Sequence, residues 1–219
     1  MKCARESTKQ RLLRTAERLF AQNGIDAVSM RSICVEADQR NNTALQYHFG
    51  DKQNLVEAIL ADRMGSINER RQMMLEQIQS QGCEGDLHRL VAALVTPFTD
   101  QLRDEAGGRY YVRFAAQVFS SGNAVELLTD RRPWSKAFHA IVDLIRACLA
   151  DVPQEVMAGR LMLMANQLVH ATAAKEYELA KSGPRQRSQS IARFTDDLVD
   201  YVVGGLTAPV SSERRKLAS

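Results

Sequence analysis

The sequence predicts an all-α fold, with an N-terminal three-helix helix-turn-helix domain and a larger C-terminal helical domain. Three observations lead to this prediction. Apolar residues recur at helical spacing, no segment shows the alternation typical of strands, and only five prolines and twelve glycines interrupt the 219 residues. We expect residues 1–52 to form the first domain, residues 53–208 the second, and residues 209–219 a flexible tail.

Two helices are expected before residue 38. Ser7 and Gln10 have the spacing of a capping box, and Asn23-Gly24 should end the first helix because glycine accepts the left-handed conformation. Ser29 is a suitable N-cap for a second helix of about two turns. The first helix has one continuous apolar face, formed by Leu12, Leu13, Ala16, Leu19 and Phe20.

A third short helix is expected within residues 39–52, whose sequence is QRNNTALQYHFGDK. Asn41 can cap this helix, while Ala44, Leu45 and Phe49 can face inward at helical spacing. The remaining side chains are unusually rich in amides. We therefore expect a short helix that packs on the first two and keeps one face polar.

Longer helices are expected in the rest of the chain. Asp51 can cap a fourth helix that runs toward Gln79, and it should connect the small domain to the large one. Residues 154–181 and 186–206 should form two further long helices with broad apolar faces. Two copies of this last pair could form a four-helix contact.

The second helix, a short turn and the third helix have the order of a helix-turn-helix. The major groove of B-DNA is about 12 Å wide and admits one helix, whose first side chains can reach base edges. Arginine suits guanine, amides suit adenine, and no carboxylate occurs from Gln39 to Gly50. The candidate base-reading residues are Arg40, Asn41, Asn42, Thr43 and Gln46.

Charge supports this interpretation weakly. The protein has a net charge of +3, and the residues through Lys52 already account for an excess of three positive charges. A domain that binds polyanions would show this bias, and so would an ordinary solvated helix face. Both interpretations stay open on charge alone.

The segment from Thr8 to Ile59 resembles the N-terminal domain of the tetracycline-repressor (TetR) family of bacterial transcriptional regulators. The resemblance is carried by ERLFAQNGIDAVSMRSI and EADQRNNTALQYHFGDKQNLVEAIL, and the QRNN-type turn resembles one subgroup. It implies phosphate contacts by Ser29 and by the pair Tyr47 and His48, with Lys52 as the basic residue at the start of helix four. The expected DNA-binding residues are thus Ser29, Arg31, Arg40, Asn41, Asn42, Thr43, Gln46, Tyr47, His48 and Lys52.

Three positions in this domain leave alternatives open. One residue more than the usual family spacing lies between Ala37 and Phe49, so Asn41 and Asn42 either read bases or cap the helix. Asp38 replaces the usual turn glycine; aspartate tolerates the left-handed region, but its charge would also suit an accessory dimer that no longer binds an operator. Cys34 is either a buried inert thiol or a redox sensor.

The resemblance also implies a ligand-responsive repressor. Operator binding, at a palindromic double-stranded DNA site, would be relieved by a small apolar or amphipathic effector, and the homodimer would form through the last two long helices. Aromatic and methionine residues of the C-terminal domain are either core or pocket. The candidate ligand-binding residues are Tyr110, Phe114, Phe119, Trp134, Phe138 and Met162.

Other classes of function lack their signatures in the sequence. We find no phosphate loop, metal-binding His pair or nucleophile elbow, so we expect no enzyme, no metal site and no cofactor. The four cysteines are widely spaced, and neither a signal peptide nor a membrane-spanning run is evident. These features predict a cytoplasmic protein without a membrane partner.

Overall fold

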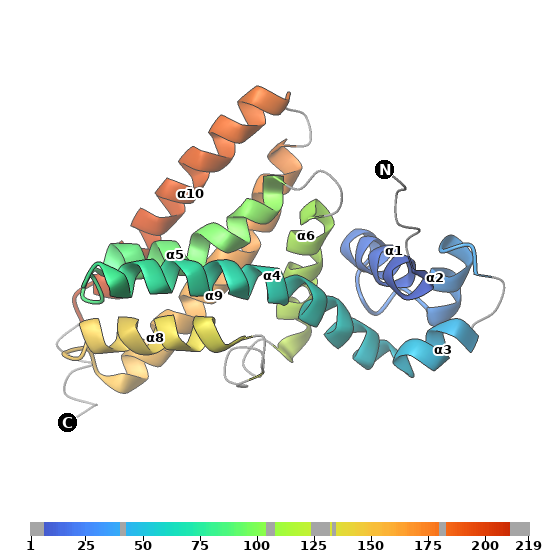
Figure 1. Ribbon diagram of the computed structural model, residues 1–219, viewed down its shortest axis with the longest axis horizontal. Helices are drawn as coiled ribbons and strands as arrows, with labels where there is room; N and C mark the ends of the chain where they lie inside the picture. The colour runs from blue at the N-terminus through green and yellow to red at the C-terminus, as the bar shows by residue number, and fades with distance from the viewer. Residues whose placement is uncertain are drawn as a thin grey trace.

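The computed structural model describes residues 7–39, 43–103, 108–123, 132, 135–179 and 183–210. Within these ranges all regular secondary structure is helical, so the predicted all-α fold is confirmed. Figure 1 shows three short helices, α1 to α3, at one end of the molecule and a bundle of longer helices at the other. Helix α4 runs from the first group into the second.

The three N-terminal helices begin and end close to the predicted positions. They are α1 (Thr8–Asn23), α2 (Met30–Glu36) and α3 (Thr43–Phe49). The Ser7 hydroxyl accepts a hydrogen bond from the Gln10 N–H at 3.2 Å and caps α1. Gly24 ends α1 with φ 85°, a value that a side chain would strain. Helix α1 therefore begins and ends where the sequence predicts, and the hydrogen bond from the Gln10 N–H to Ser7 is one half of the predicted capping box.

The bundle consists of six α-helices and two short irregular helical turns within the described residues. Asp51 caps α4 by accepting a hydrogen bond from the Asn54 N–H at 2.8 Å, as the sequence predicts. The elements are α4 (Lys52–Ser80), α5 (Leu87–Thr99), the 3₁₀ turn η1 (Asp100–Arg103), α6 (Gly108–Val118), the π turn η2 (Phe119–Asn123), α8 (Lys136–Cys148), α9 (Gln154–Leu179) and α10 (Pro184–Thr207).

One apolar core runs through both ends of the molecule. Helix α1 packs against α6, where the rings of Phe20 and Phe114 stack with centroids 6.1 Å apart. Helix α1 is also tied to α4 by Glu17, whose carboxylate accepts two hydrogen bonds from Arg63 at 2.8 and 2.9 Å. The N-terminal helices are therefore attached to the bundle through both α4 and α6.

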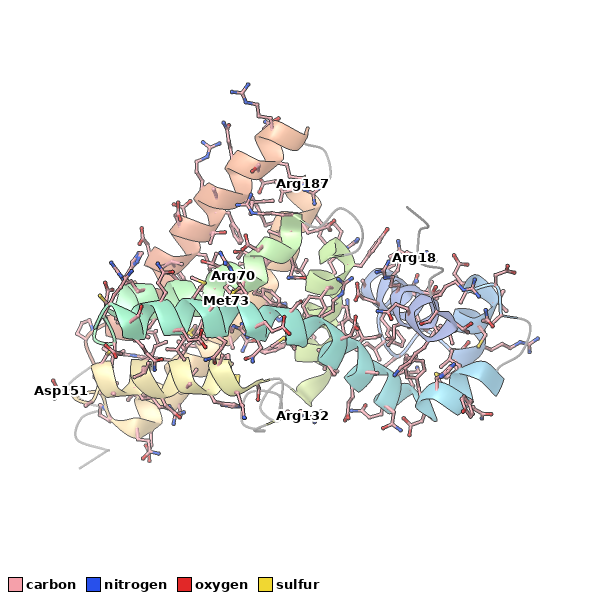
Figure 2. The ribbon with its side chains drawn as sticks, viewed as in Figure 1. Arg18, Arg70, Met73, Arg132, Asp151 and Arg187 are labelled. Atoms are coloured by element: carbon pink, nitrogen blue, oxygen red, sulfur yellow. The ribbon has the colours of Figure 1, made fainter. Side chains whose placement is uncertain are left out.

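The last helix is anchored at both ends by arginine. Near its start, the Arg187 guanidinium donates to the Leu102 carbonyl of η1 at 3.0 and 3.3 Å (Figure 2). Near its end, Arg160 of α9 donates to the Leu206 carbonyl at 2.6 Å. These bonds hold α10 against η1 and α9. In the part of the chain that the structure describes, no helix is long and apolar enough to cross a membrane.

Candidate DNA-binding surface and ligand cavity

Helix α2 begins with a reciprocal capping box. The Ser29 hydroxyl accepts from the Ser32 N–H at 3.0 Å, and the Ser32 hydroxyl accepts from the Ser29 N–H at 3.1 Å. Arg31, in the first turn, is exposed. This cap satisfies backbone groups at the start of α2 and fixes the point at which Ser29 and Arg31 meet solvent.

The turn after α2 passes through the left-handed region at Asp38, where φ is 57°. The Asp38 N–H donates to the Val35 carbonyl at 3.1 Å, and the Gln39 N–H donates to the Cys34 carbonyl at 2.9 Å. Carbonyls at the end of α2 are thereby satisfied. The predicted left-handed conformation of Asp38 is confirmed, and the turn forms without glycine.

Helix α3 separates inward from outward side chains, as its spacing predicts. Leu45 is fully buried and Phe49 is nearly so, whereas Gln46, Tyr47 and His48 are exposed. Tyr47 is 84% exposed, and its ring lies edge-on to the His48 ring with centroids 5.2 Å apart. An aromatic hydroxyl, an imidazole and an amide are therefore available to an external partner.

The remaining predicted DNA-binding residues have different placements. The Lys52 ammonium donates to the Ile25 and Asp26 carbonyls at 3.0 and 3.3 Å, so it holds the connector between α1 and α2. Thr43 is the first residue of α3. The predicted residues Arg40, Asn41 and Asn42 lie outside the described residues.

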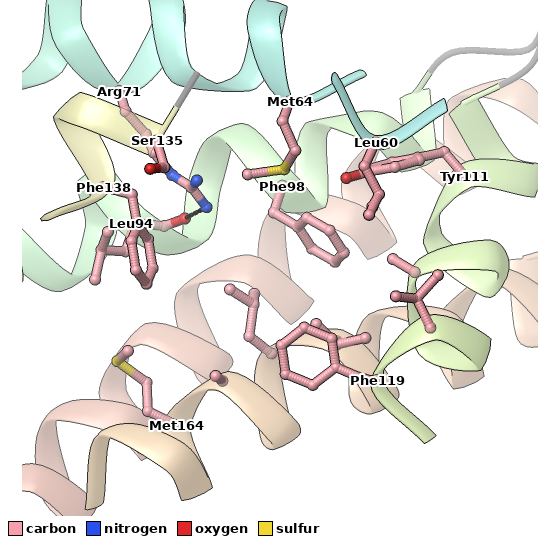
Figure 3. A pocket seen from close by; sticks show the side chains of 15 residues that line it. Leu60, Met64, Arg71, Leu94, Phe98, Tyr111, Phe119, Ser135, Phe138 and Met164 are labelled. Atoms are coloured by element: carbon pink, nitrogen blue, oxygen red, sulfur yellow. Dashed lines mark hydrogen bonds between the residues drawn. The ribbon is translucent and has the colours of Figure 1, made fainter. Parts of the chain in front are cut away.

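A second candidate site lies inside the bundle. A cavity of about 80 Å³ is lined by residues of α4, α5, α6, η2, α8 and α9, and its walls are mostly apolar (Figure 3). The described lining residues are Leu60, Met64, Arg71, Leu94, Phe98, Tyr111, Ala115, Val118, Phe119, Ser135, Phe138, Met164, Ala165, Leu168 and Val169.

Arg71 is the charged residue in this wall, and it is only 2% exposed. Its Nη2 donates to the Leu94 carbonyl at 3.1 Å, and the guanidinium carbon lies 5.4 Å from the centre of the Phe138 ring. Nε and Nη1 have no hydrogen-bond partner. Burial lowers the pKa of Arg71 to about 10, so the side chain is still a cation at neutral pH.

Tyr111 is the other large polar side chain in the wall, and it is 1% exposed. Burial raises the pKa of Tyr111, while the positive charge of Arg71 opposes the shift, so its phenol is neutral at physiological pH. The charges of Glu17 and Arg63 also act on this phenol. Tyr111 is therefore within electrostatic range of the ion pair that joins α1 to α4.

The sequence matches two family models, which together cover both ends of the molecule. Residues 12–59 match the model described as bacterial regulatory proteins, tetR family, and residues 92–205 match the tetracyclin repressor-like C-terminal domain. The second match spans more than half of the chain. The chain belongs to the TetR family. Members of this family are DNA-binding transcription regulators with a C-terminal ligand-binding domain, and they are not enzymes.

Comparison with solved structures finds several proteins similar to this chain at low identity, two of them described as TetR-family regulators. A protein from Shewanella sp. PV-4, described as a tetR family transcription regulator, is 22% identical with a TM-score of 0.47, covering 88% of this chain and 98% of that one. A similarly described protein from Mesorhizobium loti MAFF303099 is 18% identical with a TM-score of 0.43. The match covers 90% of this chain and 95% of that chain. Salmonella enterica GusR is 21% identical with a TM-score of 0.41, and the match covers 92% of this chain and 96% of that chain.

Family membership therefore rests on the two family models, because every TM-score above is below 0.5. None of the curated protein sequences matches this chain. The matches do not distinguish the subgroup with a QRNN-type turn, which stays a prediction.

The structure brings only some of the predicted ligand-binding residues to the cavity of this TetR-family protein. Phe119 and Phe138 line it. Phe114 is fully buried against Phe20 instead, Tyr110 lies beside Arg113, with its ring centre 5.3 Å from the guanidinium carbon, and Met162 is a half-buried residue elsewhere on α9. Trp134 lies outside the described residues.

Arg71 was absent from the residues predicted for this site, although the sequence contains a signal for it. The buried face of α4 includes Ile67, Arg71, Leu75 and Ile78, at helical spacing. A cation on an otherwise apolar helix face is unusual, because a buried charge is costly unless it is paired. The spacing of Arg71 with its apolar neighbours would have marked it as a candidate binding residue.

Helix α6 contacts both the cavity and the DNA-binding domain. Tyr111, Ala115 and Val118 line the cavity, while Phe114 of the same helix stacks on Phe20 of α1. A molecule that moved the cavity side of α6 would therefore also move the surface on which α1 is packed. The sequence predicts a connection between the two domains through the fourth helix, and the structure adds this second contact through α6.

Proposed function

We propose that this TetR-family protein is a repressor that binds a palindromic operator as a homodimer and is released by a small apolar or amphipathic molecule in the bundle cavity. The observation that carries the proposal is α6, which forms a cavity wall with Tyr111 and packs against α1 with Phe114. This arrangement is what a regulator needs to relate ligand binding to the position of its DNA-binding helices.

The proposed DNA-binding domain comprises residues 1–52. Tyr47 and His48 would contact the phosphate backbone, and Gln46 would reach base edges in the major groove. Ser29 and Arg31 at the start of α2 would contact phosphate, as would Lys52 if it exchanged its carbonyl partners for DNA. Arg40, Asn41, Asn42 and Thr43 complete the proposed set, and the first three precede α3 in the sequence.

The proposed dimer forms through α9 and α10, within an effector-binding and dimerisation domain of residues 53–208. Leu163 of α9 is 70% exposed and Tyr201 of α10 is 64% exposed, so a partner subunit could bury both side chains. Both line a groove between the two helices. A two-fold partner that buried these side chains would place two α3 helices on successive major grooves.

Release would follow from linkage. A ligand shifts an equilibrium only by its differential affinity for two conformations. The proposed effector prefers a conformation in which α6 displaces α1 and separates the two α3 helices by a distance that the operator does not match. Binding of the operator and of the effector would then weaken each other by the same factor.

The deciding experiment selects DNA fragments from a random pool with the purified protein and measures binding of the selected site. We expect a palindromic site. Tyr47→Ala should weaken binding to selected and unrelated DNA alike, whereas Gln46→Ala should reduce discrimination at one base pair in each half-site, by about 1–3 kcal/mol.

Met73→Ala is the control, since Met73 is exposed on α4 and belongs to neither proposed surface (Figure 2). It should bind the selected site like the parent protein. Failure of the parent protein to bind any fragment at low salt would refute the proposed DNA recognition. Selection of a site without symmetry would refute the proposed dimeric arrangement.

A further inference from the structure

The bundle cavity contains a positive charge with incomplete pairing. Arg71 reaches into it from α4, and Figure 3 shows the guanidinium beside Leu94 and Phe138, with Phe98 and Phe119 along the remaining length of the cavity. Nε and Nη1 carry three N–H bonds, and no acceptor is present for them. The one carbonyl acceptor on Nη2 does not neutralise the charge.

This arrangement costs stability in the free protein. A buried cation loses its hydration, and a single carbonyl dipole restores only part of that free energy. None of the described lining residues is acidic, and no salt bridge of Arg71 occurs in the described part of the chain. A methionine or leucine at this position of α4 would pack without the cost. Packing alone therefore does not explain why a charged residue occupies position 71.

We propose that the ligand of this cavity is a small carboxylate with an apolar body, whose oxygens accept hydrogen bonds from the unpaired N–H groups of Arg71. This assignment rests on the proposed function for the location of the ligand, and it specifies the ligand's charge and chemical class. Charge-assisted hydrogen bonds between guanidinium and carboxylate are among the strongest in proteins. The apolar walls would hold the rest of the molecule.

The residues around Arg71 suit a ligand that carries a single negative charge. Tyr111 is neutral, so it neither supplies a competing anion nor adds a second cation. Helix α8 begins at the cavity wall beside Ser135, and the positive end of its dipole adds to the attraction for an anion. A phosphate dianion would need more hydrogen-bond donors than this wall offers. The Ala137 and Phe138 N–H groups are already occupied, because they donate to the Asn68 side-chain oxygen at 3.1 and 3.3 Å.

The size of the cavity limits the apolar body. A volume of about 80 Å³ suits a chain of a few carbons or one ring, and a longer chain requires side chains to move. Met64 and Met164 lie in the wall, and unbranched thioether side chains change rotamer more easily than branched ones. We therefore expect affinity to rise with chain length and then to fall once Met64 and Met164 can move no further.

The experiment compares carboxylates with uncharged analogues on the full-length protein. Isothermal titration calorimetry at pH 7 measures the affinity for butanoate, hexanoate, octanoate, decanoate and benzoate, and for the alcohol of matching length or ring. We expect the tightest carboxylate to bind roughly 10- to 100-fold more tightly than its alcohol, the range of one charged hydrogen-bonded contact. Arg71→Met should abolish this preference for the carboxylate over the alcohol, and Arg71→Lys should retain part of the preference.

A purely structural role for Arg71 predicts something different. If Arg71 only supported the fold, Arg71→Met would lower the melting temperature, and carboxylate and alcohol would bind the parent protein equally. The proposal expects an unchanged or higher melting temperature for Arg71→Met without ligand, because a buried charge is removed. Arg70→Met is the matched control, since Arg70 is the exposed neighbour on α4 and should leave both ratio and melting temperature unchanged (Figure 2).

The remaining outcomes separate this proposal from the proposed function. Equal binding of carboxylates and alcohols, or no binding of any carboxylate in the series, overturns the assignment of Arg71 and leaves operator binding intact. Carboxylate binding that depends on Arg71, in a protein that selects no DNA, supports the anion site and refutes the repressor. Release of the selected DNA by the tightest carboxylate, lost in Arg71→Met, supports both.

Discussion

The ion pair between Glu17 and Arg63 should be a principal contact holding the DNA-binding domain to the bundle. Their two hydrogen bonds are 2.8 and 2.9 Å long, and the side chains are only 5% and 17% exposed. We predict that Glu17→Gln lowers the free energy of unfolding. The amide keeps the shape of the carboxylate, but it removes the charge and turns one acceptor into a donor that faces the guanidinium.

The size of this effect follows from burial. Breaking a fully buried ion pair costs about 3–5 kcal/mol, and water that reaches the partly exposed Arg63 reduces the cost to about 2–4 kcal/mol. Glu36→Gln is a matched control, because Glu36 pairs with Arg18 at 2.7 Å while their side chains are 50% and 32% exposed. That pair also joins α1 to another helix, and its loss should cost less than about 1 kcal/mol.

Urea unfolding followed by circular dichroism measures both variants, at one protein concentration so that dimerisation does not shift the midpoint. The expected result is a large loss for Glu17→Gln and a small one for Glu36→Gln. Equal losses would show that burial does not determine the strength of these contacts, and an unchanged midpoint for Glu17→Gln would refute the assigned role of the pair.

Three further predictions concern other parts of the molecule. Leu163→Asp should convert the dimer to a monomer in analytical ultracentrifugation, whereas Met73→Asp, equally a charge on an exposed apolar site, should not; a dimeric Leu163→Asp protein would contradict the proposed interface. Asp38→Val should cost about 1–2 kcal/mol in urea unfolding because φ is 57°, and no loss would argue against that backbone conformation. Burial raises the pKa of Cys34, so mass spectrometry should show slower alkylation there than at the half-buried Cys83; equal rates would revive the redox-sensor alternative.

Local signals were sufficient to predict the DNA-binding end of the molecule. Ser7, Ser29 and Asp51 each act as the cap that the sequence indicates, because capping is a contact between residues three positions apart. Asp38 adopts the left-handed conformation for a similarly local reason. Leu45 and Phe49 turn inward because helical spacing alone fixes their common face.

The cavity depends on contacts between distant segments, and the sequence did not predict its lining. Tyr110, Tyr111 and Phe114 occur close together in α6, but helical spacing does not reveal which face meets α1 and which meets the cavity. That choice depends on where α1, α5 and α9 lie around α6. The sequence places Arg71 within an apolar face, yet the lack of an acceptor for its Nε and Nη1 groups becomes evident only when five other elements surround it.

The two proposals together imply that the anionic group and the apolar body of the ligand have different effects. Arg71 is on α4 and bonds to the Leu94 carbonyl of α5, so an anionic group there would bind to the part of the bundle farther along α4 from the DNA-binding domain. The apolar body would contact Tyr111, Ala115 and Val118 of α6, which packs on α1. The charge would then supply mainly affinity, and the apolar body would supply the displacement of α6. A series of carboxylates of increasing length should therefore change the release of DNA more steeply than it changes binding to the free protein, because only the body differs between them.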